Sequence, residues 1–202
     1  VIHQFMRQAG DIPGSYTDLI NVEAPGVPTG TAILQMGRFT NQYLDSQFEN
    51  GGDGTRYEYE LVYGMLPSVP GDVESVKYAQ EGPSADGILI RDLGDDREAY
   101  RNNFLIKNNL DEDTYAGVMA MAKALGQPAG SAAYFAATQA TLDVDQWLRA
   151  FAAGALAAVG DNYFAGAGHN ATFYQRPSDG KMLLFPQDMD FAFVAGATSP
   201  LV

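Results

Sequence analysis

Apolar side chains recur at helical spacing in the second half of the chain. After Asp143 they fall three or four residues apart, at Val144, Trp147, Leu148, Phe151 and Ala155. This spacing predicts a helix over residues 143–159 whose apolar face packs against a core. Asp143 can cap its first turn, with Gln146 three residues on as in a capping box. Gly160 suits the left-handed position past the helix end.

The rest of the chain divides into further helices and strands. Helical spacing predicts helices over residues 1–10, 39–48, 96–109, 112–125 and 131–140. Extended or alternating runs predict strands over residues 16–22, 31–36 and 55–63. Residues 24–30 and 64–95 carry repeated Pro and Gly, which predicts a turn in the first segment and a long ordered loop in the second.

A β-hairpin is predicted near the carboxyl end. Two short apolar or aromatic runs, residues 171–176 and 181–186, flank a Pro-Ser-Asp-Gly sequence that favours a chain reversal. The hairpin would return the chain to the neighbourhood of Asn170. Because alternate residues of an extended segment share a face, Asp188 and Asp190 can then point at one cation.

Four polar residues in the last fifth of the chain therefore converge. Asp161 follows the predicted helix, Asn170 follows a glycine-rich loop, and Asp188 and Asp190 follow the hairpin. Kinases use this order, with one Asp that takes the hydroxyl proton and an Asn and a second Asp that hold Mg²⁺. Carboxylate and amide oxygens, water and phosphate are ligands that suit Mg²⁺. We predict a metal and phosphate site here.

Several segments around these residues resemble one family. They are DVDQWLRAFA at 143–152, GDNY at 160–163, GHN at 168–170, TFYQRP at 172–177 and FPQDMDFAF at 185–193, with weaker similarity at 100–109 and 38–61. At these positions the chain resembles the spore-coat CotH kinase family, an atypical branch of the protein-kinase-like fold. The resemblance implies Asp161 as the catalytic residue, Asn170 and Asp188 as residues that bind the nucleotide and metal, and Asp190 as a further metal ligand.

The resemblance also implies a fold and an activity. The expected fold is α+β and kinase-like, in a single domain over residues 1–202. Residues 1–95 would form a small, partial, β-rich amino-terminal lobe with a connecting loop, and residues 96–202 a mainly helical carboxyl-terminal lobe with the β-hairpin near the metal site. The expected activity is phosphoryl transfer from ATP, with Mg²⁺ or Mn²⁺, to a hydroxyl of a protein substrate.

Other features keep alternatives open. Residues 35–38 hold no carboxylate where family members carry an acidic residue, and the chain has no G-x-G-x-x-G loop. None of its four lysines is predicted to lie in a V-A-I-K-like strand, and it starts at Val1 without Met. We therefore expect a longer parent polypeptide that supplies the first strands of the nucleotide lobe. The alternatives are an inactive pseudokinase, or a structural or adhesive module of a cell-surface protein whose acidic cluster binds Ca²⁺.

The composition of the chain limits the classes of partner that it is expected to bind. The net charge is −13 and the pI about 4.3, so the phosphate backbone of nucleic acid would be repelled, and a bound nucleotide would need cations. No run of 18 apolar residues predicts a membrane span. The absence of cysteine excludes disulfides and thiolate metal ligands. Few lysines, many Asp and Gly residues and the family resemblance together indicate an extracellular or cell-surface protein.

Overall fold

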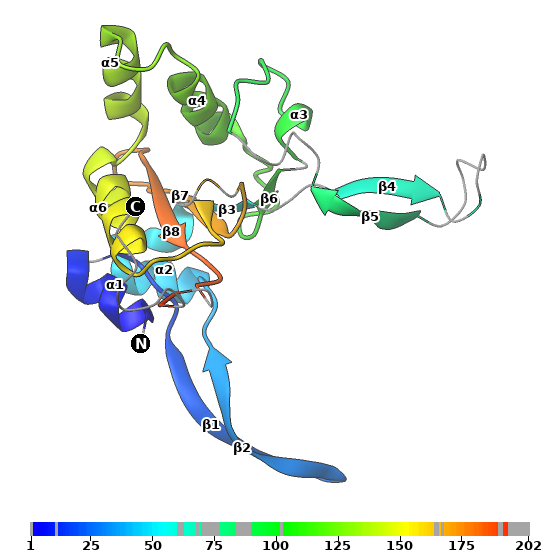
Figure 1. The fold of residues 1–202 in the computed structure, drawn as a ribbon. Coiled ribbons are helices and arrows are strands. Elements are labelled where there is room, and N and C mark those ends of the chain that lie inside the picture. Colours follow the sequence, from blue (N-terminus) through cyan, green and yellow to red (C-terminus); the bar gives the residue numbers. More distant parts are fainter. Residues whose placement is uncertain are drawn as a thin grey trace.

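The computed structural model describes residues 2–10, 12–59, 63–67, 69, 77–83, 90–101, 103–163, 166, 168–189 and 192–193. The helices of this part are α1 (Ile2–Gly10), α2 (Asn41–Gln47), the 3-10 turn η1 (Gly51–Asp53), α3 (Glu98–Arg101), α4 (Ala116–Leu125), α5 (Ala132–Thr141) and α6 (Val144–Leu156). The strands are β1 (Thr17–Ala24), β2 (Val27–Met36), β3 (Thr55–Tyr59), β4 (Tyr63–Pro67), β5 (Lys77–Pro83), β6 (Phe104–Ile106), β7 (Ala171–Gln175) and β8 (Met182–Pro186). The helices and antiparallel sheets confirm the predicted α+β class (Figure 1).

The central sheet has four antiparallel strands in the order β6-β3-β7-β8. Tyr57 of β3 pairs with Ile106 of β6 on one side and with Phe173 of β7 on the other, and Phe173 pairs with Leu184 of β8. Strand β3 comes from the predicted amino-terminal part and the other three from the predicted carboxyl-terminal part. The sheet therefore joins the two parts, and the predicted boundary at residue 95 stays a prediction.

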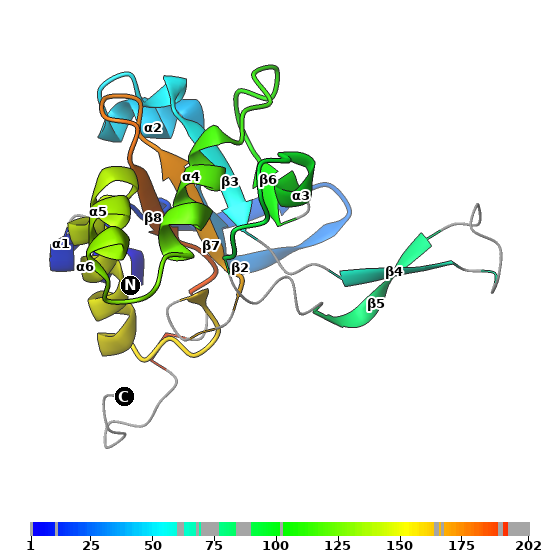
Figure 2. The ribbon, with the colours of Figure 1, turned by 90° about the horizontal axis from the view of Figure 1, so that it is seen from above.

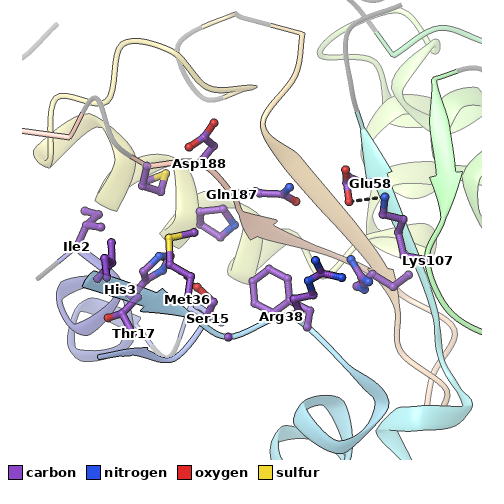
Figure 3. A pocket seen from close by; sticks show the side chains of 16 residues that line it. Ile2, His3, Ser15, Thr17, Met36, Arg38, Glu58, Lys107, Gln187 and Asp188 are labelled. Carbon is purple, nitrogen blue, oxygen red and sulfur yellow. Dashed lines mark hydrogen bonds and ion pairs between the residues drawn. The ribbon is translucent and has the colours of Figure 1, made fainter. Parts of the chain in front are cut away.

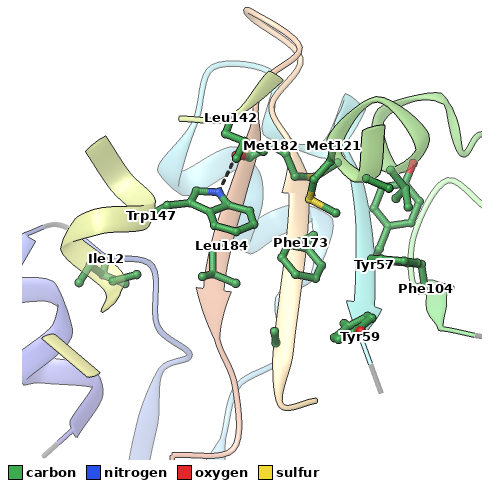
Figure 4. Close-up of a cluster of buried hydrophobic side chains, with 14 of the residues drawn as sticks. Ile12, Tyr57, Tyr59, Phe104, Met121, Leu142, Trp147, Phe173, Met182 and Leu184 are labelled. Atoms are coloured by element: carbon green, nitrogen blue, oxygen red, sulfur yellow. Dashed lines mark hydrogen bonds between the residues drawn. The ribbon is translucent and has the colours of Figure 1, made fainter. Parts of the chain in front are cut away.

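Both faces of the β7-β8 hairpin are covered, because alternate side chains enter two cores. On one face, Phe173 and Leu184 pack with Trp147 of α6 and Met121 of α4, as Figure 4 shows. The ring centroids of Trp147 and Phe173 are 5.6 Å apart. On the other face the packed side chains are Phe39, Tyr43, Leu44, Tyr174, Leu183 and Phe185, which join α2 to the hairpin. The predicted turn at residues 177–180 is exposed, as expected.

Helix α6 is fixed to β8 by two side chains of its first turn. Gln146 donates from Nε2 to the Leu184 carbonyl (2.7 Å) and accepts at Oε1 from the Leu184 amide (2.9 Å). Trp147 donates from Nε1 to the Met182 carbonyl at 2.9 Å. The Asp143 carboxylate caps the helix by accepting from the Gln146 amide at 3.3 Å, as predicted. The capping box is wrong in its second half, because the Gln146 side chain is bound to β8.

The predicted details of α6 need further correction. Its core-facing residues are Gln146, Trp147, Ala150, Ala153 and Gly154. Leu148, predicted to be buried, is 60% exposed, and Phe151 is only partly buried. The helix ends at Leu156, three residues earlier than predicted. The left-handed residue after it is Ala158, with φ of 51°, and not Gly160.

Three other predicted segments differ from the structure. Residues 96–109 form only the short helix α3 and then strand β6, because Phe104–Ile106 pairs with β3. Residues 64–95 were expected to be a loop, but their described part includes most of β4 and all of β5, which form a hairpin. Strand β2 starts at Val27, so the predicted turn over residues 24–30 is shorter.

Two hairpins project from the body. Figures 1 and 2 show the β1-β2 hairpin and the β4-β5 hairpin extending in different directions from the central sheet. The helices cluster along the sheet, and α1 lies beside α6, where Arg149 donates to the Gly10 carbonyl at 2.9 Å. No helix in the described ranges combines the length and apolar character that a membrane crossing requires.

Candidate active site

The segment after α6 is held by one buried amide. Asn162 is fully buried, and its Nδ2 lies 2.9 Å from the Asn170 carbonyl oxygen and 3.0 Å from that of Gln187. The same atom is 3.3 Å from the sulfur of Met189. A primary amide can donate two hydrogens, so a single side chain can join two irregular backbone segments. Asn162 therefore ties the loop after α6 to the segments before β7 and after β8.

This tie brings Asp161 and Asn170 together. Asn170 donates from its side-chain amide to the backbone carbonyl of Asp161 at 2.8 Å. Asn170 is 8% exposed, and its φ of 56° is left-handed, a region that Asn occupies more readily than most residues. The Asp161 carboxylate lies 2.9 Å from Nε2 of His169, and its side chain remains 44% exposed. The glycine-rich insertion between them, residues 165–168, lies in part outside the described residues.

Asp188 lies on the segment that Asn162 holds. The amide of the preceding residue, Gln187, donates to the Asn170 carbonyl at 3.3 Å, which places the two predicted metal-binding segments side by side. Asp188 is exposed and has a left-handed φ of 49°. Asp190, the fourth predicted site residue, lies outside the described residues. The described residues include no group of three or more His, Asp or Glu side chains arranged to hold a metal.

The predicted metal site therefore depends on a mixed donor set. Asn170 offers an amide oxygen and Asp188 a carboxylate, and both are hard oxygen donors of the kind that Mg²⁺ and Mn²⁺ take. Mg²⁺ usually keeps several waters and binds phosphate oxygens of the substrate, so two protein ligands suffice. The residues present thus fit the cation, and their roles as ligands stay a prediction.

Asp188 also lines a pocket of about 690 Å³. Figure 3 shows Asp188 and Gln187 on one side of this pocket, and Glu58 and Lys107 on the other. Nζ of Lys107 is 2.9 Å from the Glu58 carboxylate. Arg38 and Arg56 line the pocket as well. The residues of the pocket wall do not include Asp161 or Asn170.

Burial also acts on a histidine of the pocket wall. His3 of α1 lies with Nε2 3.4 Å from the Ser15 hydroxyl, and its Nδ1 is buried with no hydrogen-bond partner. Burial, the larger cause, lowers the pKa of His3 from its ordinary value of 6.5. The imidazole is therefore neutral at pH 7.

Sequence reasoning missed two parts of this region. Lys107 directly follows strand β6 in the sequence Phe-Leu-Ile-Lys, and this apolar run ending in a lysine was the available signal. It was hidden because residues 96–109 were assigned to a helix. Asn162 was also missed, although an Asn next to a candidate catalytic Asp is suited to satisfy irregular backbone.

Comparison with known proteins identifies the family of the chain. The family model of the CotH kinase protein matches residues 34–198, which is most of the chain. The matched range includes Asp161, Asn170 and Asp188, and also Arg38, Glu58 and Lys107 of the pocket. No curated protein matches the chain.

Proposed function

This chain belongs to the CotH kinase family, and we propose that it transfers a phosphoryl group from metal-bound ATP to a protein hydroxyl. One observation supports the proposal most strongly: the buried amide of Asn162 joins the segments that carry Asp161, Asn170 and Asp188. In kinases the catalytic Asp, the metal-binding Asn and the metal-binding Asp follow in this order and meet at the transferred phosphate.

We assign to Asp161 the role of orienting the acceptor hydroxyl of the protein substrate. Its carboxylate is partly exposed, so a substrate can reach it, and His169 at 2.9 Å limits its orientation. A carboxylate in this position orients the attacking hydroxyl and receives its proton. We place that hydroxyl on an exported or cell-surface protein, as the composition and the family suggest.

We assign the cation to Asn170 and Asp188, with Asp190 as a further ligand. The bound Mg²⁺ or Mn²⁺ would offset the negative charge of the ATP phosphates. In a chain with a net charge of −13 this compensation should strengthen the binding of a nucleotide near Asp188. Asn162 holds the backbone of both ligand segments and thereby fixes the distance between them.

We assign the ATP phosphates to the pocket beside Asp188. Lys107 would contact them, and Glu58 at 2.9 Å would hold the Lys107 side chain in place. Protein kinases use a Lys–Glu ion pair for this purpose. Here the pair comes from β3 and from the residue after β6, so a phosphate-binding lysine is available within this chain.

Transfer of labelled phosphate tests the proposal. The purified chain is incubated with γ-labelled ATP, Mg²⁺ or Mn²⁺ and dephosphorylated casein as a test acceptor. We expect transfer that requires the cation and that falls about 100-fold or more in Asp161→Asn. The matched control is Asp145→Asn, which removes an exposed carboxylate of α6 that is not part of the pocket wall.

Two results would contradict the proposal. Equal transfer by wild type and Asp161→Asn would remove the catalytic role of Asp161. Nucleotide binding without transfer to casein or to the chain itself would instead identify a pseudokinase.

A further inference from the structure

Two arginines of the pocket have no acidic partner in the part of the chain that the structure describes. Arg38 follows β2 and Arg56 lies in β3, and both line the pocket. Within the described ranges, no carboxylate lies within ion-pair distance of either guanidinium. The Nε of Arg56 is buried and has no hydrogen-bond partner among the described residues. A buried donor without a partner costs about 1–3 kcal/mol, so an unpaired guanidinium at a pocket wall requires an explanation.

The charges around Arg56 indicate which kind of ligand would pair with its guanidinium. Burial is the main cause that lowers the pKa of Arg56, and the positive charge of Arg38 lowers it further. Glu58 acts in the opposite direction, but its carboxylate is already 2.9 Å from Lys107. Three cations thus share the pocket wall with two carboxylates, of which Glu58 is already engaged by Lys107 and Asp188 lies on the other side. An anion in the pocket would relieve the repulsion and the desolvation together.

General composition does not explain this gathering of cations. The chain has 12 basic and 25 acidic residues, yet three of the basic ones line this single pocket. Asp188, on the other side, is the residue assigned to the cation that would accompany a phosphate ligand. The pocket volume of about 690 Å³ lies within the usual range for small-molecule sites.

We infer that Arg38 and Arg56 form a binding site for the polyphosphate of the nucleotide, which they contact alongside Lys107. The planar guanidinium presents paired N–H donors that match two oxygens of a phosphate group, a match that chloride cannot offer. Three cations together also favour the higher charge of a polyphosphate over that of a single carboxylate. The inference deepens the proposed function and rests on it for the identity of the ligand. The anion site itself rests on the geometry of the pocket.

The site is tested by titrating the full chain with sodium tripolyphosphate, without divalent cation and at low salt, in a calorimeter. We expect binding by wild type and a loss of affinity of about tenfold in Arg38→Gln and in Arg56→Gln. Arg97→Gln is the matched control, because Arg97 is an exposed arginine paired with Glu98 and lies outside the pocket wall. It should bind as wild type does. ATP should displace tripolyphosphate competitively.

The exposure of Arg38 and one further variant at Arg56 keep the test decisive. Arg38 is exposed, so Arg38→Gln should fold even if Arg56→Gln does not. Arg56→Lys keeps the charge and loses the planar fork, and it should bind tripolyphosphate more weakly than wild type. No binding by wild type, undiminished binding by Arg38→Gln, or an equal loss in Arg97→Gln would overturn the site. Failure of ATP to compete would overturn its assignment to the nucleotide.

The site and the proposed function can fail separately. Arginine-dependent tripolyphosphate binding by a chain that transfers no phosphate would support the anion site and contradict the kinase activity. Phosphate transfer by a chain whose arginine variants bind tripolyphosphate as wild type does would have the opposite meaning.

Discussion

Nε2 of His169 lies 2.9 Å from the carboxylate of Asp161. The His169 side chain is 16% exposed, and its Nδ1 is buried without a hydrogen-bond partner among the described residues. The contact with Asp161 is therefore made by Nε2, the other ring nitrogen. An N–H at Nε2 can donate to the carboxylate and so limits its orientation. His169 is therefore a positioning residue for the proposed catalytic carboxylate.

Replacing His169 should affect transfer and spare binding. In His169→Ala the Asp161 carboxylate loses its partner and samples more orientations, so we expect kcat to fall about tenfold while KM for ATP stays within twofold. His169→Gln, which can still donate to the carboxylate, should recover part of the loss. Steady-state kinetics give both constants. An unchanged kcat in His169→Ala would show that the pair is only structural.

Asp188→Asn should weaken nucleotide binding only when a divalent cation is present. The variant removes the charge that offsets the cation, so we expect the affinity for Mg-ATP to fall about tenfold or more. Without the cation, the variant should bind ATP at least as tightly as wild type, because it removes a negative charge beside the phosphates. Titration calorimetry with and without Mg²⁺ separates the two cases. The control is Asp179→Asn in the exposed turn at 177–180, which should match wild type.

Asn162→Ala should lower both stability and transfer. It leaves the Asn170 and Gln187 carbonyls without this donor, which should cost about 1–3 kcal/mol of unfolding free energy. Urea denaturation measures that loss. The matched control is Asn109→Ala, since the Asn109 amide likewise donates to two backbone carbonyls, those of Gly52 and Gly54. It should lose stability but retain transfer, and equal transfer by the two variants would contradict the role of Asn162.

The stability of the chain should depend on pH through His3. Because burial lowers the pKa of His3 in the folded state, the unfolded chain binds more protons below its ordinary value of 6.5. The contribution of His3 is therefore fully present above pH 6.5 and is lost as the pH falls through the lower folded pKa. Denaturation between pH 5 and 8 should show this slope, and His3→Asn should reduce it. Equal slopes would contradict the assignment.

Two glycines should respond in opposite ways to substitution by alanine. A Cβ at Gly51 would lie 2.1 Å from the Leu44 carbonyl oxygen, so Gly51→Ala forces α2 and η1 apart and should cost about 2 kcal/mol or more. A Cβ at Gly160 meets nothing within 4 Å, and its φ is not left-handed. Gly160→Ala should change stability by less than about 0.5 kcal/mol. Thermal denaturation of both variants provides the comparison.

The features that depend only on neighbouring residues, such as a helix cap and a turn, could be predicted from the sequence. Asp143 caps α6 through an amide three residues away, and the turn at 177–180 needs only its own Pro and Gly, so both were predicted. The buried face of α6 was predicted less well, because Gln146 is drawn inward by Leu184, a residue 38 positions further on. Strand β6 was missed for the same reason, since three residues become a strand only by pairing with β3.

One part of the candidate site could likewise be predicted from the sequence, and another part could not. The order of Asp161, Asn170 and Asp188 is written in the sequence, and the structure brings their backbone segments together. The pocket was not predictable from that order. Its cations come from three separate segments, around Arg38, Arg56 and Lys107, and only the pairing of β3 with β6 places the last two side by side.

The attachment of α6 to β8 also limits how other chains can bind. Strand β8 is an outer strand of the four-stranded sheet, and an outer strand normally offers free backbone groups to an added strand. Here Gln146 occupies both the amide and the carbonyl of Leu184, while the Asp143 amide and the Trp147 ring occupy the Met182 carbonyl. An extended peptide cannot extend the sheet at these residues. An acceptor protein of the proposed kinase would therefore reach Asp161 without β-augmentation at these residues of β8.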